Sequence, residues 1–519
     1  MRVKVWLTFL CATLCCISGY AQEHYATPRK EIRHLVMADG SQTQAQIPNS
    51  MQRASGEYIM TEFPTTGDIK GIVILAAFSD VPFSTDSVSI NELLSNRFNA
   101  ENYTEDVSFE EYSKIYAQTL SLNVTIPGSA RDYYRTQSFG KFVPSFDVIG
   151  PITLDKQRSY YGGNNSSGND KNTDGMIREA CQKAYDMGLT DFKDYDNDGD
   201  GVVDFVYVVY AGSDEAQTQI KDAVWAKASQ ISLTLGEMKI RRYACSGELV
   251  IDLPVVAGIG TFVHEFSHVL GLPDFYNTIN SKSEKLSMDV WSVMDYGLYN
   301  AEGFVPCGYT AFERYSLGWI PIKNLDTPSA MNIGTTDEEG VGYRIFTSEI
   351  DSTTLVTEAD TASFFLVETI RKEGWNRYAP ANGLLISQVT YKASAWQNNK
   401  VNTETAYRHY IVPANNHWSI INGYNPRLHL FGTQNHEFTT TSMPSSITQF
   451  GAAMDKPLTE INYDAITGRT SFYFCGGTGI EEPTDMNHGT KPQYDLWGRP
   501  IKDRTEGFYI QDGKTHLRP

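Results

Sequence analysis

The chain has 519 residues, of which 41% are hydrophobic and 20% are charged, and its formal net charge is −19. This amount of apolar material can fill large cores, which excludes an intrinsically disordered protein, and the length predicts about three folding units. The acidic balance excludes nucleic acid as a partner, because contact with phosphates requires a basic surface.

The first residues predict export from the cytoplasm. Arg2 and Lys4 precede an apolar stretch over 5–17, and small or polar residues follow. This is the layout of a secretory signal peptide, and the apolar stretch is too short to span a membrane. We expect a signal peptide over 1–21, whose removal takes the net charge from −19 to −21. Three cysteines before the predicted cut leave a lipoprotein as a minor alternative.

Four widely spaced cysteines follow the predicted cut: Cys181, Cys245, Cys307 and Cys475. This spacing is not that of a disulfide framework, although it is compatible with one or two bridges. We therefore expect hydrophobic cores, and not disulfides, to stabilise the fold.

The first part of the chain mixes strand and helix patterns. Residues 22–66 are polar and weakly patterned, which predicts a leader or propeptide. The apolar runs 71–78 and 202–211 predict strands that are buried on both faces. Between these runs, 91–122 and then 129–140 have helical patterns. The mixture suggests an α/β or α+β domain, of which we favour α+β, and we place it at 67–320.

The second part of the chain is predicted to be rich in β-structure. Residues 321–475 are β-branched and aromatic, with Gly, Asn and Asp between the runs, which predicts a sandwich-like region. The clearest strands are expected at 345–356, 364–370 and 384–391. Residues 476–519 predict a linker and a short C-terminal β segment. We find no later apolar run that is long enough for a transmembrane segment.

The strongest chemical pattern is HExxHxxGxxD, which starts at His264. The apolar residues around it recur with a helical period and predict a helix with one buried side. His264 and His268 lie one turn apart on the other side, where both imidazoles can bind one metal ion. Glu265 lies beside them and can reach a metal-bound water. The alternative is a helix that carries these residues on its surface.

The residues that follow this helix complete the predicted metal site. Gly271 can adopt the left-handed conformation that ends a helix. The chain then turns back, so that Asp274 becomes the third ligand of a zinc ion. A chemical alternative takes the third ligand from a later acid, Glu284 or Glu313.

The sequence SVMDYG at 292–297 has the form of a Met-turn. Met294 would place an apolar floor beneath the metal ligands. Tyr296 would stabilise the oxyanion that forms during catalysis. The alternative is that both side chains are ordinary core residues.

A second metal site is predicted in the acidic run over 194–204. Carboxylates fall at positions 1, 3, 5 and 9 of a calcium-type loop, and glycine stands at position 6. These carboxylates are Asp196, Asp198, Asp200 and Asp204. Tyr207 replaces the bidentate glutamate of an EF-hand at position 12. We therefore expect a structural calcium site that departs from an EF-hand, and a solvated acidic turn is the alternative.

Together, these motifs resemble the immune inhibitor A-like family of secreted bacterial zinc metallopeptidases. The resemblance covers 67–320, through stretches at 128–134, 146–151, 204–211 and 315–319, and continues more loosely at 365–368, 374–375, 383–386 and 401–402. It implies a zincin, metzincin-like catalytic domain followed by β-rich modules. It also implies zinc ligation by His264, His268 and Asp274, with Glu265 as the catalytic base.

We therefore expect a zinc-dependent endopeptidase, secreted or on the surface of a bacterium, that hydrolyses a protein or peptide substrate. A metal-activated water would attack the peptide bond, with Glu265 as general base. The alternative is a surface-exposed binding or adhesion protein with a weak or vestigial peptidase domain, but the complete HExxH motif favours the enzyme. The segment 494–514 resembles tails that act in sorting in Bacteroidetes-type bacteria, and a terminal hairpin is the alternative. The sequence does not indicate an oligomeric state.

Overall fold

The computed structural model describes residues 51–52, 58–59, 64–113, 118–166, 168–280, 283–347, 362–476, 507–511 and 514–518. The chain divides into two compact units, residues 1–476 and residues 477–519. The predicted signal peptide lies outside the described residues. Of the predicted leader, the structure describes a short antiparallel pair, β1 (Met51–Gln52) and β2 (Tyr58–Ile59), and the segment from residue 64.

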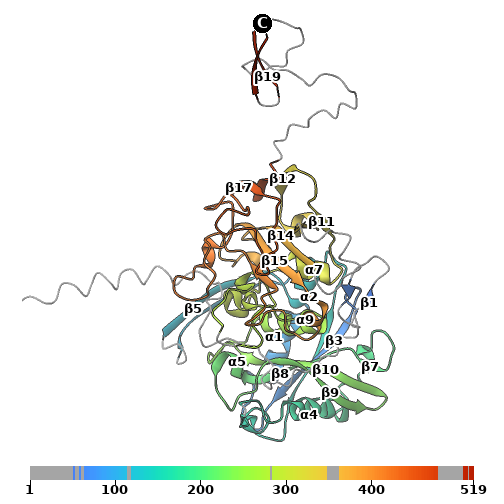
Figure 1. The fold of residues 1–519 in the computed structure, drawn as a ribbon. Helices are drawn as coiled ribbons and strands as arrows, with labels where there is room; N and C mark the ends of the chain where they lie inside the picture. Colours follow the sequence, from blue (N-terminus) through green and yellow to red (C-terminus); the bar gives the residue numbers. More distant parts are fainter. Residues whose placement is uncertain are drawn as a thin grey trace, which may run out of the picture. The chain divides into compact units, whose positions relative to one another are not determined.

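A mostly parallel sheet forms the centre of the first part of the chain (Figure 1). Its strands lie in the order β6-β3-β8-β10-β7, all parallel, and β9 pairs with β10 in the antiparallel direction. Their bounds are β3 Lys70–Ala77, β6 Ser145–Thr153, β7 Val202–Val203, β8 Val206–Ser213, β9 Lys227–Leu235 and β10 Met238–Leu249. Both predicted buried strands are confirmed, the second as β7 and β8.

Helices cover both faces of this sheet. On β3, Ile72 and Ile74 belong to a hydrophobic cluster that includes α4 (Thr173–Asp186). The alternate residues Val73 and Leu75 belong to a second cluster that includes α1 (Ser87–Asn99) and α6 (Gly260–Val269). Successive side chains of a strand point to opposite faces of the sheet. One continuous apolar run therefore contributes side chains to the hydrophobic clusters on both faces. The domain is thus a mixed α/β structure.

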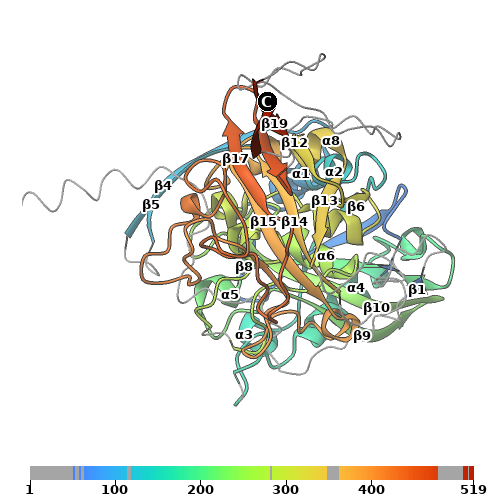
Figure 2. The same cartoon turned by 45° about the horizontal axis from the view of Figure 1, so that its top comes forward.

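The predicted helix over 91–122 is correct only at its start. Helix α1 ends at Asn99, and β4 (Glu105–Ser113) then pairs with β5 (Gln118–Ile126) as an antiparallel hairpin. Leu122, Val124 and Ile126 are buried and alternate with more exposed neighbours, which is the period of a strand and not of a helix. In both views the hairpin projects from the body (Figures 1 and 2). The helical expectation for 129–140 is confirmed by α2 (Ala130–Gln137).

Two sheets follow in the second part of the chain. A five-stranded sheet has the order β11-β13-β14-β15-β16, and a three-stranded sheet has the order β12-β18-β17. The bounds are β11 Ile322–Asn324, β12 Ser329–Ile333, β13 Gly342–Phe346, β14 Ala362–Ile370, β15 Gly383–Tyr391, β16 His409–Ile411, β17 Leu458–Asp464 and β18 Arg469–Phe474. The predicted strands at 364–370 and 384–391 are confirmed. The strand expected at 345–356 is seen only in its first residues, because 348–356 lie outside the described residues.

The two sheets share a hydrophobic core with residues such as Phe365 and Phe472. In the second unit, β19 (Gly507–Gln511) pairs with β20 (Lys514–Arg518) as an antiparallel hairpin.

The core around α6 crosses residue 320, the predicted domain boundary. Val263 and Met294 belong to the same buried cluster as Trp375 and Trp396. Trp375 packs edge-on against Tyr133, with ring centroids 4.9 Å apart. The part of the chain that follows residue 320 therefore helps to build the surroundings of the HExxH helix.

Short helices complete the first unit. They are α3 Arg158–Tyr161, α5 Glu215–Thr218, α7 Ala311–Ser316, α8 Thr336–Glu339 and α9 Ala393–Gln397, with 3₁₀ helices η1 Lys193–Tyr195, η2 Asp289–Trp291, η3 Tyr296–Gly303, η5 Gly374–Asn376 and η6 Pro426–Leu428. In the part of the chain that the structure describes, no helix is long and apolar enough to cross a membrane. The four cysteines after the predicted cut are all free thiols.

Candidate active site

Helix α6 is anchored to the sheet by two phenylalanines one turn apart. The ring of Phe262 lies 4.8 Å from that of Tyr207, and the ring of Phe266 lies 4.8 Å from that of Phe205, between centroids. At the start of the helix, a Cβ atom on Gly260 would lie 2.1 Å from the carbonyl oxygen of Leu298. The helix is thus held along its length and at its N-terminal end, which fixes the direction of its other side.

The two histidines of that side meet Asp274. The Nε2 atoms of His264 and His268 lie 3.3 Å and 3.2 Å from Asp274 Oδ1. His264 and Asp274 are buried, and the His268 side chain is 20% exposed. Ligand atoms of the three residues all lie within 4.8 Å of one another, so the group is able to hold one metal ion. Glu265 is also buried, which is incompatible with a helix that carries these residues on its surface.

Backbone carbonyls orient both imidazoles. His264 Nδ1 lies 2.8 Å from the carbonyl oxygen of Val293, and His268 Nδ1 lies 2.8 Å from that of Leu272. Because a carbonyl oxygen accepts, Nδ1 carries the proton, and in a neutral imidazole the lone pair is on Nε2. His264 Nε2 and Asp274 Oδ1 are buried and make no hydrogen bond within the described residues. Two imidazole nitrogens and a carboxylate oxygen are a donor set that suits zinc.

The charges of the group favour a cation between the ligands. Burial raises the pKa of Glu265 to about 7, against the attraction of the two histidines. Burial alone would lower the pKa of His268, but the negative charge of Asp274 raises it to about 9. Burial would likewise raise the pKa of Asp274, but the attraction of His268 holds it well below its usual range. Asp274 is therefore an anion that requires a positive partner, and a proton on His268 or a metal ion provides one.

The turn after α6 brings Asp274 to this position. Gly271 has φ +99°, and the backbone N–H of Leu272 donates to the carbonyl of Ser267 at 3.0 Å. This is the Schellman arrangement that ends helices at a left-handed residue. It also places the Leu272 carbonyl against His268. The conformation predicted for Gly271 is confirmed.

Met294 lies where the SVMDYG sequence meets this turn. Its side chain is fully buried, and its carbonyl accepts a hydrogen bond from the backbone N–H of Phe275 at 2.8 Å. Tyr296 is half-buried against the same core, and its backbone N–H donates to Asp295. A role of Tyr296 in stabilising an oxyanion stays a prediction.

The alternative third ligands have other surroundings. Glu313 is fully buried, and its carboxylate accepts hydrogen bonds from the hydroxyls of Ser292 (2.6 Å) and Thr310 (2.8 Å). Glu284 is exposed. Neither belongs to the group formed by His264 and its two partners, so the geometry favours Asp274.

The acidic loop brings three of its four predicted ligands together. Carboxylate oxygens of Asp196, Asp198 and Asp200 lie within 4.8 Å of one another. Asp204 lies apart from this group, and its Oδ2 accepts hydrogen bonds from the backbone and side-chain N–H groups of Asn197. Gly201 has φ +80° and donates its N–H to Asp196 Oδ2 at 2.9 Å. The loop therefore differs from the expected four-carboxylate set.

Sequence spacing did not identify Asn399, which contacts Asp274 from the other part of the chain. The Nδ2 atom of Asn399 donates to Asp274 Oδ2, and the backbone N–H of Asp274 donates to Asn399 Oδ1, both at 2.7 Å. The two residues are 125 positions apart. The sequence feature nearest to Asn399 is the loose family resemblance at 401–402, and it does not include Asn399.

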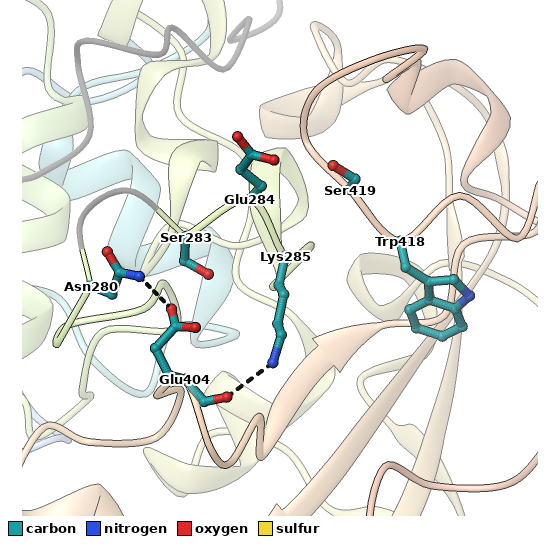
Figure 3. Close-up of a pocket in the computed structure, with 7 residues that line it drawn as sticks. All are labelled: Asn280, Ser283, Glu284, Lys285, Glu404, Trp418 and Ser419. Atoms are coloured by element: carbon teal, nitrogen blue, oxygen red, sulfur yellow. Dashed lines mark hydrogen bonds between the residues drawn. The ribbon is translucent and has the colours of Figure 1, made fainter.

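A pocket of about 350 Å³ opens on the segment that follows Asp274. Its lining residues are Asn280, Ser283, Glu284, Lys285, Glu404, Trp418 and Ser419. Figure 3 shows Asn280 and Lys285 turned toward Glu404, where Asn280 donates to the carboxylate and Lys285 donates to the backbone carbonyl. The lining includes none of the three candidate metal ligands, so the pocket is separate from them.

Part of the chain is similar to known metalloproteases. Residues 62–319 match the family model of the immune inhibitor A peptidase M6 catalytic domain. Pre-pro-metalloprotease PrtV of Vibrio cholerae is 26% identical over 282 residues, which cover 48% of this chain and 29% of that protein. Immune inhibitor A of Bacillus thuringiensis subsp. alesti is 24% identical over 304 residues, which cover 50% of this chain and 42% of that protein. The match thus spans less than half the length of either relative.

Proposed function

Since residues 62–319 belong to the immune inhibitor A peptidase M6 family, we propose that this chain is a secreted zinc-dependent endopeptidase. The observation that carries the proposal is the group of buried His264 and Asp274 with half-buried His268, and with Glu265 beside it on α6. We further propose a metzincin-like fold for the catalytic part and a sandwich-like arrangement for the β-rich part.

Zinc would be held by the Nε2 atoms of the two histidines and by Asp274. Bound there, it would polarise the scissile carbonyl and lower the pKa of a water molecule. Fully buried Met294 would form the apolar floor beneath the ligands. The carbonyls of Val293 and Leu272 keep both imidazoles in the orientation that metal binding requires.

Glu265 would act as the general base. Its pKa of about 7 lets it accept a proton from the attacking water near neutral pH and then pass that proton to the leaving amine. The substrate would be a protein or peptide, and the hydroxyl of Tyr296 would donate to the oxyanion. The family membership and the names of both relatives support peptide-bond hydrolysis.

We also propose a structural calcium site in the loop from Asp196 to Asp204. The three converging carboxylates support it, and the left-handed Gly201 matches the sixth position of a calcium loop. Asp204 would act there by holding Asn197, not as a direct ligand. Removal of calcium should lower the melting temperature, and calcium but not zinc should restore it.

The remaining features of the proposal concern location. A signal peptide over 1–21 would direct the chain out of the cytoplasm, 22–66 would be a leader, and the C-terminal segment would act in sorting. These follow from the sequence patterns and from the family resemblance.

The decisive experiment combines a peptide library with two glutamate variants. The wild-type chain should cleave the library, and a zinc chelator should abolish cleavage. Glu265→Ala should abolish cleavage while zinc content stays near stoichiometric, and Glu437→Ala, which changes an exposed glutamate, should keep full activity. Full activity of Glu265→Ala would contradict the assignment.

A further inference from the structure

We infer that Asn399 is a positioning residue for the metal site: its side-chain amide fixes the orientation of the Asp274 carboxylate. The inference rests on the proposed function, because it treats Asp274 as a metal ligand. It assigns a role at the catalytic centre to a residue that lies 80 positions beyond the segment matched by the family model.

The two oxygens of Asp274 have different surroundings. Oδ1 faces the Nε2 atoms of His264 and His268 at 3.3 Å and 3.2 Å. Oδ2 accepts a hydrogen bond from Asn399 Nδ2 at 2.7 Å. Since Asp274 is only 2% exposed, water has little access to replace this donor. The amide therefore holds Oδ2 and leaves Oδ1 facing the two histidines, and the buried Tyr276 hydroxyl is a second hydrogen-bond partner of Asp274.

Asn399 holds the backbone of Asp274 as well as its side chain. Its Oδ1 accepts the backbone N–H of Asp274 at 2.7 Å, so one planar amide contacts two groups of the same residue. A hydrogen bond at each end restricts both the position of the Asp274 backbone and the rotation of its carboxylate. Outer partners of this kind orient metal ligands in other proteins and contribute to metal affinity.

The backbone of Asn399 is itself fixed. It follows α9 and has φ +51°, a left-handed conformation that asparagine tolerates better than most residues. Its N–H donates to the carbonyl of Trp396 at 3.2 Å, and its own carbonyl accepts from the Thr278 hydroxyl at 2.7 Å. Trp396 is 1% exposed, so this anchor is part of the core. The amide is thus held in place before any metal binds.

The contact belongs to a longer pairing between two segments, 274–280 and 399–404. The side chain of fully buried Asn402 donates to the carbonyl of Phe275 at 2.6 Å, and Asn402 forms a parallel bridge with Asn277. The Glu404 carboxylate then accepts from the side chain of Asn277, and also from that of Asn280 (Figure 3). Three residues of 399–404 therefore contact the segment that carries the metal ligand, and Asn399 is the one that contacts the ligand itself.

Two substitutions isolate the amide. Asn399→Gly removes it and keeps the left-handed conformation. Asn399→Asp keeps the size of the side chain but replaces the donor that faces Asp274 Oδ2 with a carboxylate oxygen. The neighbouring asparagine provides the matched control, because the Asn398 amide donates to the carbonyl of Ser394, 2.6 Å away, and not to Asp274.

The experiment measures zinc affinity of the full chain by competition with a chromophoric chelator. It also records the visible absorption spectrum of the cobalt(II)-substituted protein, which reports the ligand geometry. We expect Asn399→Gly and Asn399→Asp to bind zinc about 10–100-fold more weakly than the wild type, with altered cobalt spectra. Asn398→Gly should match the wild type in both measurements.

The outcomes separate this inference from the proposed function. If the wild type binds zinc, and both Asn399 variants bind it with unchanged affinity and an unchanged cobalt spectrum, the role of Asn399 is overturned and the proposed function stands. If the wild type binds no zinc, the proposed function fails, and the role of Asn399 fails with it. A loss of folding could imitate a loss of affinity. Two variants are therefore used: glycine tolerates the left-handed backbone conformation, and aspartate preserves the side-chain volume.

Discussion

Glu368 links the two parts of the chain through a buried carboxylate, and replacing it by glutamine should change how stability depends on pH. It comes from β14, is 5% exposed, and accepts hydrogen bonds from the first backbone N–H of α7, at Ala311 (3.1 Å), and from the hydroxyl of Thr336 (3.2 Å). Burial raises its pKa from 4.5 to about 7, against these hydrogen bonds and the attraction of Arg314.

The sign of the effect follows from the two pKa values. Below the unfolded value of 4.5, the carboxyl is protonated in both states and its burial carries no ionisation cost. Between that value and about 7, the unfolded chain ionises first, so the free energy of unfolding falls as the pH rises. Above about 7 the cost is constant at about 3 kcal/mol, and most of it develops between about pH 5 and about pH 8. Glutamine does not titrate.

The assay is urea unfolding followed by tryptophan fluorescence at these two pH values. The free energy of unfolding of Glu368→Gln, relative to the wild type, should increase by about 2–3 kcal/mol from the lower to the higher pH. Titrations of groups that do not interact with Glu368 cancel in this difference, and Glu313, whose negative charge raises the pKa of Glu368, is a coupled carboxyl. Glu437→Gln changes an exposed glutamate, and its difference from the wild type should stay constant. An equal difference for Glu368→Gln at both pH values would refute the reasoning.

Three further predictions concern the helix and the two metal sites. Phe266→Ala should lower the free energy of unfolding by about 3–5 kcal/mol, because a ring that is 1% exposed leaves a cavity between α6 and the sheet; a loss below that of an exposed Phe139→Ala control would contradict this. Asp274→Ala should weaken zinc binding strongly, whereas Glu284→Ala should leave it unchanged, as equilibrium dialysis can establish; equal effects would favour a different third ligand. Asp196→Ala should abolish the stabilisation by calcium in thermal melts while zinc affinity is retained, and an undiminished calcium effect would remove the loop as the site.

The geometry around α6 was predictable because it is local. Residues four positions apart lie on one side of a helix, and a glycine after the last turn reverses the chain. The relative positions of His264, His268 and Gly271 can therefore be predicted from their spacing in the sequence. Burial of the apolar run at 71–78 was predictable for a similar reason, since an uninterrupted apolar strand requires cover on both faces. These features depend on the period of the backbone and not on tertiary contacts.

The features that sequence reasoning missed depend on distant contacts or on competing patterns. The pairing of 274–280 with 399–404 joins residues about 125 positions apart, and no local period encodes such a contact. The segment 105–126 contains glutamates and leucines, which also suit a helix. Buried and exposed residues alternate in its second half, which is the pattern of a strand, and the segment forms the β4–β5 hairpin. Asp204 has the sequence spacing of a calcium ligand. In the structure, however, its Oδ2 accepts hydrogen bonds from the backbone and side-chain N–H groups of Asn197.

The core that crosses residue 320 restricts how such a chain can be rearranged by recombination. A gene fragment that encodes only 62–319, the segment matched by the family model, would leave uncovered the apolar surface that Trp375, Phe364 and Trp396 occupy in the common cluster. A different β-rich segment joined at that point would need side chains that fill the same space as these three. It would also need an asparagine that hydrogen-bonds to Asp274. We therefore expect residues 62–319 and the β-rich region that follows them to be exchanged together in recombination, and not separately.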